Sequence, residues 1–512
     1  MAIFRSRKDK ERENVTLFAA ALLVAIGGII YELILGSAAS YLIGDSTLSF
    51  SIATGVTLFG MGVGSLLVKK VKGHPATSFA LNEIFLSLVG GNSVLILYIA
   101  FGFTKISWII FSIISLLIGV MIGFEIPLMM KTFEKFGRKS SVELLSKVFA
   151  IDYFGALVAS LVFPLLLLPQ LGLMRSAYFV ASLNILVSLL ILKEIKTSKK
   201  VFSLCLGAFF IVASLFVASN WLEKKIDSGI YKDPIVFYKQ TEYQKIVLTK
   251  YYNDTRLFLN NNLQFSSLDE ARYHETLAVS AMSSVENPKR VAIFGGGDGL
   301  LAREILKYPS VEHIDLVDID SEMTKLAKEN NFLRSQNEGS FFNKKVKIHN
   351  QDAFRFAFET DNKYDAVLVD LVDPSNERLA KLYSKQFYQR VNDLLTDRGV
   401  MITQATSSYF SPNAFATVFS TVKEGQRDRE VLPFSINIPS FGEWGFVMSI
   451  KDKSKVLSQP LPTNLKYQNK DNLDYIIKKN PIKINKGEIS TLLQPRIIEI
   501  YNNDMKQWRY YK

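Results

Sequence analysis

Seven long apolar stretches in the first 220 residues constrain this chain more than any other feature. A helix needs roughly 20 such residues to cross the hydrocarbon core of a bilayer. The stretches are Val15–Ile43, Leu48–Val68, Ser78–Phe103, Ile106–Met130, Val148–Leu168, Leu171–Leu192 and Val201–Asn220. Soluble cores rarely string together seven runs of this length, so we expect an N-terminal α-helical membrane bundle of about seven spans. The first is too long for a signal peptide, so we expect it to be retained.

Positive charge in this half gathers between the apolar stretches. Residues 1–220 carry 19 Lys and Arg against 11 Asp and Glu, which makes eight of the chain's twelve net positive charges. The basic segments are RSRKDKER, KKVKGH, KTFEKFGRKS and KEIKTSKK, and they alternate with charge-poor loops. This pattern is typical of cytoplasmic loops of membrane proteins and not of a nucleic-acid-binding surface. We therefore expect a multi-pass protein of the cell membrane, in contact with the lipid bilayer, with a cytoplasmic N-terminus and no nucleic-acid partner.

The composition changes after Trp221. Alternating or aromatic runs at Ile235–Tyr238, Tyr243–Thr249 and Arg256–Leu259 predict a small antiparallel β unit. From Arg290 onward, strand-like runs alternate with helical patterns, which predicts an α/β, Rossmann-like domain with a mostly parallel sheet. The expected domains are a membrane domain at 1–220, the small β unit at 221–270, the Rossmann-like domain at 271–455 and a C-terminal extension at 456–512.

A glycine turn follows the first strand of the Rossmann-like region. In VAIFGGGDGLLAREIL, Gly295 and Gly297 let the backbone turn sharply and approach a ligand closely. Asp318 ends the next strand, where an acid can accept hydrogen bonds from ribose hydroxyls. The strand, turn, helix and spaced acid together predict a nucleotide pocket of the S-adenosylmethionine type.

Asp298, inside the glycine turn, narrows the choice of ligand. Its charge at a helix N-terminus would repel a pyrophosphate, and it would also repel the carboxylate of S-adenosylmethionine. The decarboxylated form carries an ammonium group there and would be attracted. Asp is also a good helix-capping residue, so a structural role for Asp298 stays open.

Two acids end a later strand, in YDAVLVDLVDPSN. Ligands bind at the carboxyl ends of strands in such sheets, which is where Asp370 and Asp373 would lie. Asp373 precedes Pro374 and also suits turn initiation. Asp370 ends a nearly continuous apolar run, so it is the stronger candidate for chemistry.

Several motifs, in a fixed order, resemble one enzyme family. Between residues 243 and 450 the pieces YQKIVL, LDEARYHETLA, VAIFGGGDGLLAREIL, LVDID, QDA, YDAVLVDLVDP, LYSKQFY and GVMITQ resemble those of the polyamine aminopropyltransferases, the spermidine synthase family. In the first half, YELILGSAASYLIGDS, GFEIPLMM and DYFGALVASLVFPLLLLPQLGL resemble its membrane-bound, multi-pass members. The resemblance implies transfer of an aminopropyl group from decarboxylated S-adenosylmethionine to a diamine, typically putrescine. The products would be spermidine and methylthioadenosine.

The resemblance also implies the partners of the chain. Decarboxylated S-adenosylmethionine is a co-substrate, and no cofactor, redox or metal, is needed. The single cysteine and four scattered histidines match no metal-ligand spacing. Family resemblance further implies a homodimer or homotetramer.

Matching positions imply a role for each candidate site residue. Asp370 matches the group that takes a proton from the attacking amine. The donor and methylthioadenosine would be held by Gln244, Asp318, Asp352, Ala353, Gly295 and Gly297. The polyamine and the aminopropyl arm would be bound by Tyr273, His274, Asp298 and Asp373. Glu275, which would orient the loop of the Tyr-His pair, and Gln404 are weaker candidates.

Departures from the family pattern leave the acceptor amine open. Asp318 stands where the family often has a glutamate. Phe441, in NIPSFGEWGF, stands where many soluble members have a tyrosine whose hydroxyl helps to grip the acceptor. Glu443 and Trp444 follow closely and could hold an alkylammonium by charge and cation–π attraction. Core packing is an equal alternative for Trp444.

Four carboxylic acids fall within the predicted spans, namely Glu32, Glu83, Glu125 and Asp152. A charge at mid-membrane is costly, so such residues usually face the interior of a bundle and mark a site. The other half of the chain would make polycations, so we expect a membrane site for a cation or polyamine. Protonated carboxyl groups that only link helices are the alternative.

Two other functions stay open. The chain could be a membrane polyamine transporter or sensor whose nucleotide domain only binds ligand, or an S-adenosylmethionine methyltransferase. Asp370 argues against the first, because a binder needs no base there, and Asp298 argues against the second.

The side of the membrane that residues 221–512 face is open as well. Seven spans from a cytoplasmic N-terminus would place them outside. The donor is made in the cytoplasm, which favours a cytoplasmic catalytic domain.

Overall fold

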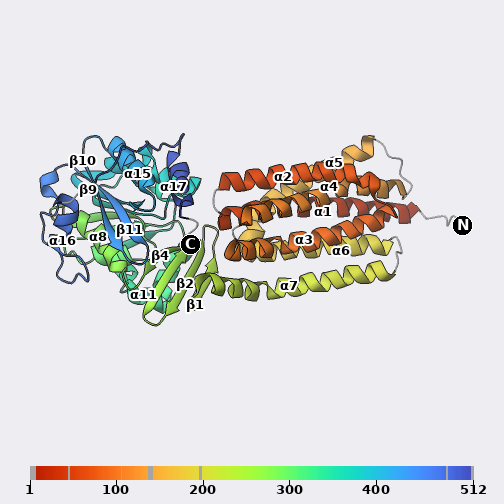
Figure 1. Cartoon of the computed structure of the whole chain (residues 1–512), viewed down its shortest axis with the longest axis horizontal. Helices are drawn as coiled ribbons and strands as arrows, with labels where there is room; N and C mark the ends of the chain where they lie inside the picture. Colours follow the sequence, from red (N-terminus) through yellow and green to blue (C-terminus); the bar gives the residue numbers. More distant parts are fainter. Residues whose placement is uncertain are drawn as a thin grey trace. The chain divides into compact units, whose positions relative to one another are not determined.

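The computed structural model describes residues 7–43, 46–104, 106–135, 142–194, 199–479 and 482–508. The chain divides into two compact units, Met1–Lys232 and Asp233–Lys512, here called the helical unit and the α/β unit. In Figure 1 the helical unit is coloured red to yellow-green and the α/β unit green to blue.

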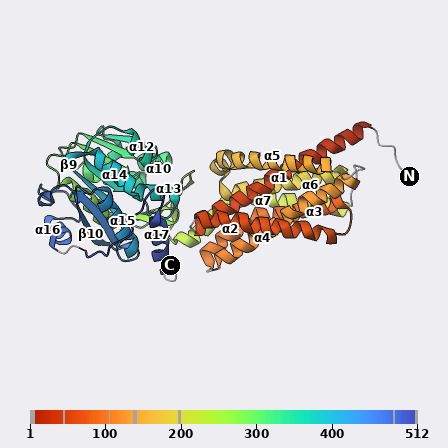
Figure 2. The same ribbon diagram turned by 90° about the horizontal axis from the view of Figure 1, so that it is seen from above.

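The helical unit is a bundle of long helices that run roughly side by side in both views (Figures 1 and 2). The helices are α1 (Arg7–Ile43), α2 (Ser46–Leu67), α3 (Pro75–Phe103), α4 (Ser107–Lys135), α5 (Val142–Val162), α6 (Leu168–Glu194) and α7 (Lys199–Tyr231). A short 3₁₀ turn, Val68–Lys70, follows α2. Among the described residues, six helical stretches are long and apolar enough to cross a membrane. Length and composition alone support this count, which is one fewer than the seven predicted spans.

The difference lies in Val142–Lys193, which counts as one stretch of 52 residues. A π-helical turn, Phe163–Leu167, joins α5 to α6, and Gly172 in α6 has a non-helical backbone with φ of 72°. A straight helix of this length would extend about 78 Å, more than twice the hydrocarbon thickness. The predicted fifth span, Val148–Leu168, includes α5 from Val148 onward and the π-helical turn, and the predicted sixth, Leu171–Leu192, lies within α6 and includes Gly172.

The α/β unit begins with a small antiparallel sheet of four strands in sequence order. The strands are β1 (Ile235–Gln240), β2 (Lys245–Tyr251), β3 (Asp254–Leu259) and β4 (Asn262–Ser266). The sequence predicted three strands here, and β4 is a fourth strand that was not predicted. Tight turns join β2 to β3 and β3 to β4, with positive φ at Tyr252, Asn260 and Asn261.

The large sheet has seven strands in the order β10-β11-β9-β8-β5-β6-β7. They are β5 (Arg290–Gly295), β6 (His313–Val317), β7 (Val346–His349), β8 (Tyr364–Asp370), β9 (Leu395–Ser407), β10 (Glu430–Ile438) and β11 (Gly442–Ile450). Strands β5 to β9 pair in parallel, whereas β11 pairs antiparallel with β9 and β10. The expected mostly parallel Rossmann-like sheet is therefore present. Its strand order reverses between β5 and β8.

Helices cover both faces of this sheet. Val291 and Ile293 of β5 point to a core shared with α8 (Glu270–Met282), α9 (Leu300–Ile305) and α10 (Ser321–Glu329). Ala292 and Phe294 alternate with them and join a second core. The helices of that second core are α12 (Ala353–Glu359), α14 (Lys385–Leu394), α15 (Pro412–Gly425) and α17 (Arg496–Lys506). The remaining short helices are α11 (Asn331–Gln336), α13 (Glu377–Ala380) and α16 (Lys470–Asp474).

The C-terminal extension is fastened to the α/β unit by buried carboxylates. Glu275, fully buried in α8, accepts backbone N–H bonds from residues 466–468 at 2.6–2.9 Å. Asp504 of α17 accepts the backbone N–H groups of Asn413 and Ala414 at 2.9 and 3.0 Å. Asp504 thereby satisfies donors at the start of α15 that have no partner within that helix. Glu275 thus fastens the extension to α8, and its role beside the Tyr-His pair stays a prediction.

Candidate active site

The switch in strand order brings the glycine turn and the acidic strand end together. Gly295 at the end of β5 is the register partner of Asp370 at the end of β8. A Cβ atom on Gly295 would lie 1.9 Å from the Asp370 carbonyl oxygen, and its φ is +88°. Only glycine permits both the close approach and this backbone conformation. The crevice at such a switch point is where ligands of doubly wound sheets bind.

Asp370 carries a carboxyl group whose ionisation is shaped by its neighbours. The Tyr273 hydroxyl donates a hydrogen bond to its Oδ1 at 2.6 Å. Burial raises the pKa of Asp370 to about 6, and Asp298 adds to the rise, while His274 and the Tyr273 hydrogen bond oppose it. A carboxyl group with this pKa is ionised at neutral pH and can accept a proton.

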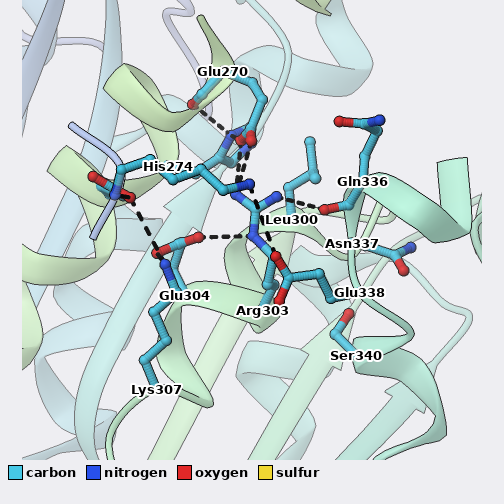
Figure 3. A network of polar contacts seen from close by, with 12 residues as sticks. Glu270, His274, Leu300, Arg303, Glu304, Lys307, Gln336, Asn337, Glu338 and Ser340 are labelled. Atoms are coloured by element: carbon cyan, nitrogen blue, oxygen red, sulfur yellow. Dashed lines mark hydrogen bonds and ion pairs between the residues drawn. The ribbon is translucent and has the colours of Figure 1, made fainter. Parts of the chain in front are cut away.

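His274, which follows Tyr273 on α8, belongs to a buried ionic network (Figure 3). Its Nδ1 is 2.9 Å from Glu270 Oε2, and both Glu270 oxygens accept hydrogen bonds from Arg303 at 2.9 Å. Burial lowers the pKa of His274, but Glu270, Asp298 and Asp370 outweigh it and raise the pKa to about 9. His274 is therefore an imidazolium at neutral pH, and its positive charge faces carboxylates of the site.

Glu270 and Arg303 were not predicted as site residues. Glu270 is 2% and Arg303 4% exposed. Arg303 also donates to Glu304 at 2.7 Å and to the Gln336 carbonyl at 2.5 Å (Figure 3). The only sequence signal was the spacing of Glu270 and His274, four residues apart and therefore on one helix face.

Asp298 and Asp318 both line the glycine turn. Asp298 Oδ1 accepts the N–H of Leu300, the first residue of α9, at 2.9 Å, so its side chain also has a structural contact at the start of this helix. Asp318 Oδ2 accepts the Gly297 N–H at 3.1 Å. Burial raises the pKa of Asp298, and burial with nearby Asp320 and Asp298 raises the pKa of Asp318 to about 7. The hydrogen bond to Gly297 places the Asp318 carboxyl group beside the glycine turn.

Gln244 reaches the large sheet through Asp320 rather than through Asp318. Its Nε2 donates to Asp320 Oδ2 at 3.0 Å. Asp320 also caps α10 by accepting the Glu322 N–H at 3.1 Å. Asp320 was not predicted as a site residue, although it is the last acid of HIDLVDID and lies two residues after Asp318.

Asp352 and Ala353 lie at the start of α12. Asp352 Oδ1 caps the helix by accepting the Phe354 N–H at 2.8 Å, and its Oδ2 forms an ion pair with Lys381. Ala353 is 6% exposed. Each carboxylate oxygen of Asp352 therefore has a partner within the protein.

Asp373 meets a residue from the C-terminal extension. The Tyr501 hydroxyl of α17 donates to Asp373 Oδ2 at 2.8 Å. Gln404 is buried, donates to the Leu371 carbonyl at 2.6 Å and contacts the Tyr383 hydroxyl. Gln404 thus supports the loop that carries Asp373. Tyr501 was missed because no motif marks the extension.

The aromatic residues near the site pack against one another. The Phe441 ring lies edge-on to Trp444 at 5.0 Å and to Tyr273 at 6.3 Å. Trp444 Nε1 is buried without a hydrogen-bond partner among the described residues. Glu443 accepts the Ser435 hydroxyl at 2.6 Å. The structure therefore gives Trp444 a packing role beside Phe441.

The four acids of the predicted spans lie in the helical unit. Glu83 and Glu125 are buried, at 0% and 6% exposure, and Asp152 is half-buried. Glu32 accepts the Thr54 hydroxyl at 2.6 Å. Among the described residues, no group of three or more His, Cys, Asp or Glu is placed to hold a metal ion.

Comparison with known proteins identifies the family. Residues 270–459 match the model of the spermine/spermidine synthase domain. The polyamine aminopropyltransferase of Leptospira interrogans is 36% identical over 491 residues, covering 94% of this chain and 98% of its own length. Polyamine aminopropyltransferase 1 of Streptomyces coelicolor is 37% identical, covering 97% of this chain and 95% of its own.

A spermidine synthase crystal structure from Thermotoga maritima covers 48% of this chain and 84% of its own, with 22% identity and a TM-score of 0.44. The full-length relatives decide the assignment, because they are more than 30% identical over 94% and 97% of this chain. This chain therefore belongs to the polyamine aminopropyltransferases and is an enzyme of that transferase family.

Proposed function

We propose that the chain transfers the aminopropyl group of decarboxylated S-adenosylmethionine to a diamine, putrescine in the first instance. The observation that carries this proposal is Asp370, an acid ionised at neutral pH that ends β8 at the switch point beside Asp298 and His274. Family membership supports aminopropyl transfer, and the charges around the glycine turn support the decarboxylated donor.

The reaction balances without a redox partner. The amine nitrogen attacks the aminopropyl carbon bonded to the sulfonium, and a carbon–nitrogen bond forms. The carbon–sulfur bond breaks, and its electron pair stays on sulfur, which leaves as the neutral thioether of methylthioadenosine. The proton lost by the amine goes to the Asp370 carboxylate, which Tyr273 holds in place.

The remaining residues divide between the two substrates. We assign Gln244, Asp318, Asp352, Ala353, Gly295 and Gly297 to the donor nucleoside. Tyr273, His274, Asp298 and Asp373 are assigned to the amine and the aminopropyl arm. Tyr501 is a positioning residue, because it acts on the amine through Asp373.

The experiment is an acceptor screen. Purified full-length protein is incubated with decarboxylated S-adenosylmethionine and a series of diamines that differ in chain length, and products are identified by mass spectrometry. We expect spermidine from putrescine. Product from S-adenosylmethionine and a methyl acceptor would support a methyltransferase instead.

Asp298→Asn is expected to weaken binding of decarboxylated S-adenosylmethionine more than binding of S-adenosylmethionine. The substitution removes the charge that attracts the ammonium of one ligand and repels the carboxylate of the other. Isothermal titration calorimetry of both ligands measures the change. Equal weakening of the two would mean that Asp298 acts only through its contact with the start of α9.

We further propose that the helical unit spans the cell membrane with a cytoplasmic N-terminus, as its basic segments favour. His74→Cys, an exposed site in the basic α2–α3 loop, tests this in a Cys205→Ser background. A membrane-impermeant thiol reagent should label it only after cells are permeabilised. Labelling in intact cells would contradict this orientation.

The same assay on Asn253→Cys, in the exposed β2–β3 turn, reports the side of the α/β unit. Six crossings keep it in the cytoplasm with the donor, whereas separate crossings by α5 and α6 would make seven and place it outside. Because the donor is made in the cytoplasm, we expect that the reagent does not label Asn253→Cys in intact cells.

A further inference from the structure

The helical unit contains a cluster of buried polar side chains that the proposed reaction does not use. It consists of Tyr31 on α1, Glu83 and Ser87 on α3, Glu125 on α4 and Asn184 on α6, here called the polar cluster. Four of them are fully buried, and Glu125 is 6% exposed. Four helices therefore each contribute at least one polar group to the interior of the bundle.

Contacts between helices bring α1, α3 and α4 together near the residues of the polar cluster. Asn82, next to Glu83, donates to the Met121 carbonyl at 3.0 Å, one turn before Glu125. A Cβ atom on Gly90 would lie 2.6 Å from the Tyr31 ring, so glycine lets α1 and α3 approach closely. The Tyr31 hydroxyl is within electrostatic range of both Glu83 and Glu125.

Asn184 brings α6 to the same place. A Cβ atom on Gly27 would lie 2.6 Å from Asn184 Oδ1, so the amide rests against α1 one turn before Tyr31. One turn along α6, Ser188 donates to the Ala80 carbonyl of α3 at 3.2 Å, and Ala80 lies one turn before Glu83. The amide of Asn184 thus lies at the level of the two carboxyl groups.

Polar atoms of this cluster have no hydrogen-bond partner among the described residues. They are Glu83 Oε2, Glu125 Oε1, the hydroxyls of Tyr31 and Ser87, and both amide atoms of Asn184. The other oxygen of Glu83, Oε1, accepts a hydrogen bond from Asn82 Nδ2 at 3.3 Å. Other hydroxyls in these helices, such as Ser93, Ser115 and Thr132, donate to a carbonyl of the preceding turn. Buried polar groups are normally paired, so this concentration of unpaired atoms indicates a missing ligand.

The chemistry of the unpaired atoms defines that ligand. Two carboxyl groups require a cation or a proton if they are to stay buried. The hydroxyl and amide oxygens add further acceptors for N–H donors, and apolar side chains such as Ile34, Ile84 and Ile118 are buried in the same core. An ammonium group on an alkyl chain matches both parts of this lining.

We infer that the polar cluster binds an alkylammonium cation of the polyamine class, at a second site separate from the transferase centre. The choice of polyamine rather than another amine rests on the proposed function of the α/β unit. Glu83 and Glu125 pair with the ammonium group, and Tyr31 and Ser87 complete its hydrogen bonds. Glu32 is not part of the cluster, since it is half-buried and has no buried oxygen without a partner among the described residues, and its Oε1 accepts the Thr54 hydroxyl.

Equilibrium binding of radiolabelled spermidine to the full-length protein in lipid nanodiscs tests this inference. The Glu83→Gln/Glu125→Gln double variant is expected to bind one equivalent fewer per chain than the parent. Glu32→Gln is the control for a Glu→Gln change in the same unit outside the cluster, and it should leave the stoichiometry unchanged. Equal stoichiometry in the parent and the double variant would overturn the inference.

Tyr31→Phe removes a single hydroxyl and provides a second, milder measurement. It should weaken this binding step about tenfold, as expected for one hydrogen bond to a charged group. Unchanged affinity would contradict the inference even if the double variant failed to fold. Displacement of spermidine by Na⁺ or Mg²⁺ at equal concentration would overturn the alkylammonium assignment. Failure of the proposed function would appear separately, as absence of product in the parent.

Discussion

Asp370→Asn is expected to lower turnover by about 10²–10⁴-fold while donor binding largely survives, which is the usual effect of losing a general base. Asparagine keeps the shape of the side chain and can still accept the Tyr273 hydrogen bond, but it cannot take the proton of the amine. Steady-state rates together with donor titration separate the two effects. A variant that turns over at the parent rate would show that Asp370 is not the base.

Asp365→Asn is the matched control for this prediction, since it makes the same change at the opposite end of β8. Asp365 accepts the N–H groups of Lys289 and Arg290, far along the strand from the glycine turn. Its turnover should stay close to that of the parent.

In the parent, kcat/KM should fall as the pH drops below about 6, because protonated Asp370 cannot act as a base. A profile that stays flat through pH 6 would contradict this assignment.

Glu270→Gln is expected to reduce the free energy of opening of α8 by about 3–5 kcal/mol, as when one partner of a buried ion pair is lost. The variant leaves Arg303 and His274, 4% and 3% exposed, without their counter-charge. Amide hydrogen exchange of residues 270–282 measures the opening directly. Glu312→Gln is the control, because Glu312 forms an exposed ion pair with Lys289 and such pairs contribute about 0–1 kcal/mol.

The pH dependence of the Glu270 effect has a defined sign. Glu270 raises the pKa of His274 to about 9, above the value of about 6.5 for unfolded histidine. The resulting stabilisation is complete below pH 6.5 and is lost as the pH rises through about 9. In Glu270→Gln, the free energy of opening of α8 should not fall in this way as the pH rises through about 9. A loss of opening free energy below about 1 kcal/mol would show that the network contributes little.

Residues that act through local sequence pattern were predictable. Gly295 and Asp370 each end a strand of the parallel sheet, Asp318 directly follows one, and strand ends meet at one edge. The partners of those residues were not predictable, because Arg303 and Tyr501 reach the site by packing between segments far apart in sequence. No pattern of apolar and polar residues in the sequence predicts that Arg303 contacts Glu270 or that Tyr501 contacts Asp373.

The same distinction applies to the fold. The alternation of strands and helices after Arg290 predicted the large sheet, whereas β4 was missed because Asn262–Ser266 is short and polar. Hydropathy located the helices of the first half but did not reveal how α5 joins α6. That connection depends on the backbone of Gly172 and on the π-helical turn before it.

The most direct test of the account is the stoichiometry of a single incubation of the full-length enzyme with decarboxylated S-adenosylmethionine and putrescine. Methylthioadenosine and spermidine are quantified together by mass spectrometry, in the parent and in Asp370→Asn. Aminopropyl transfer predicts equal amounts of the two products in the parent and about 10²–10⁴-fold less of both in the variant. Methylthioadenosine without spermidine, or equal product from the two proteins, would contradict the account.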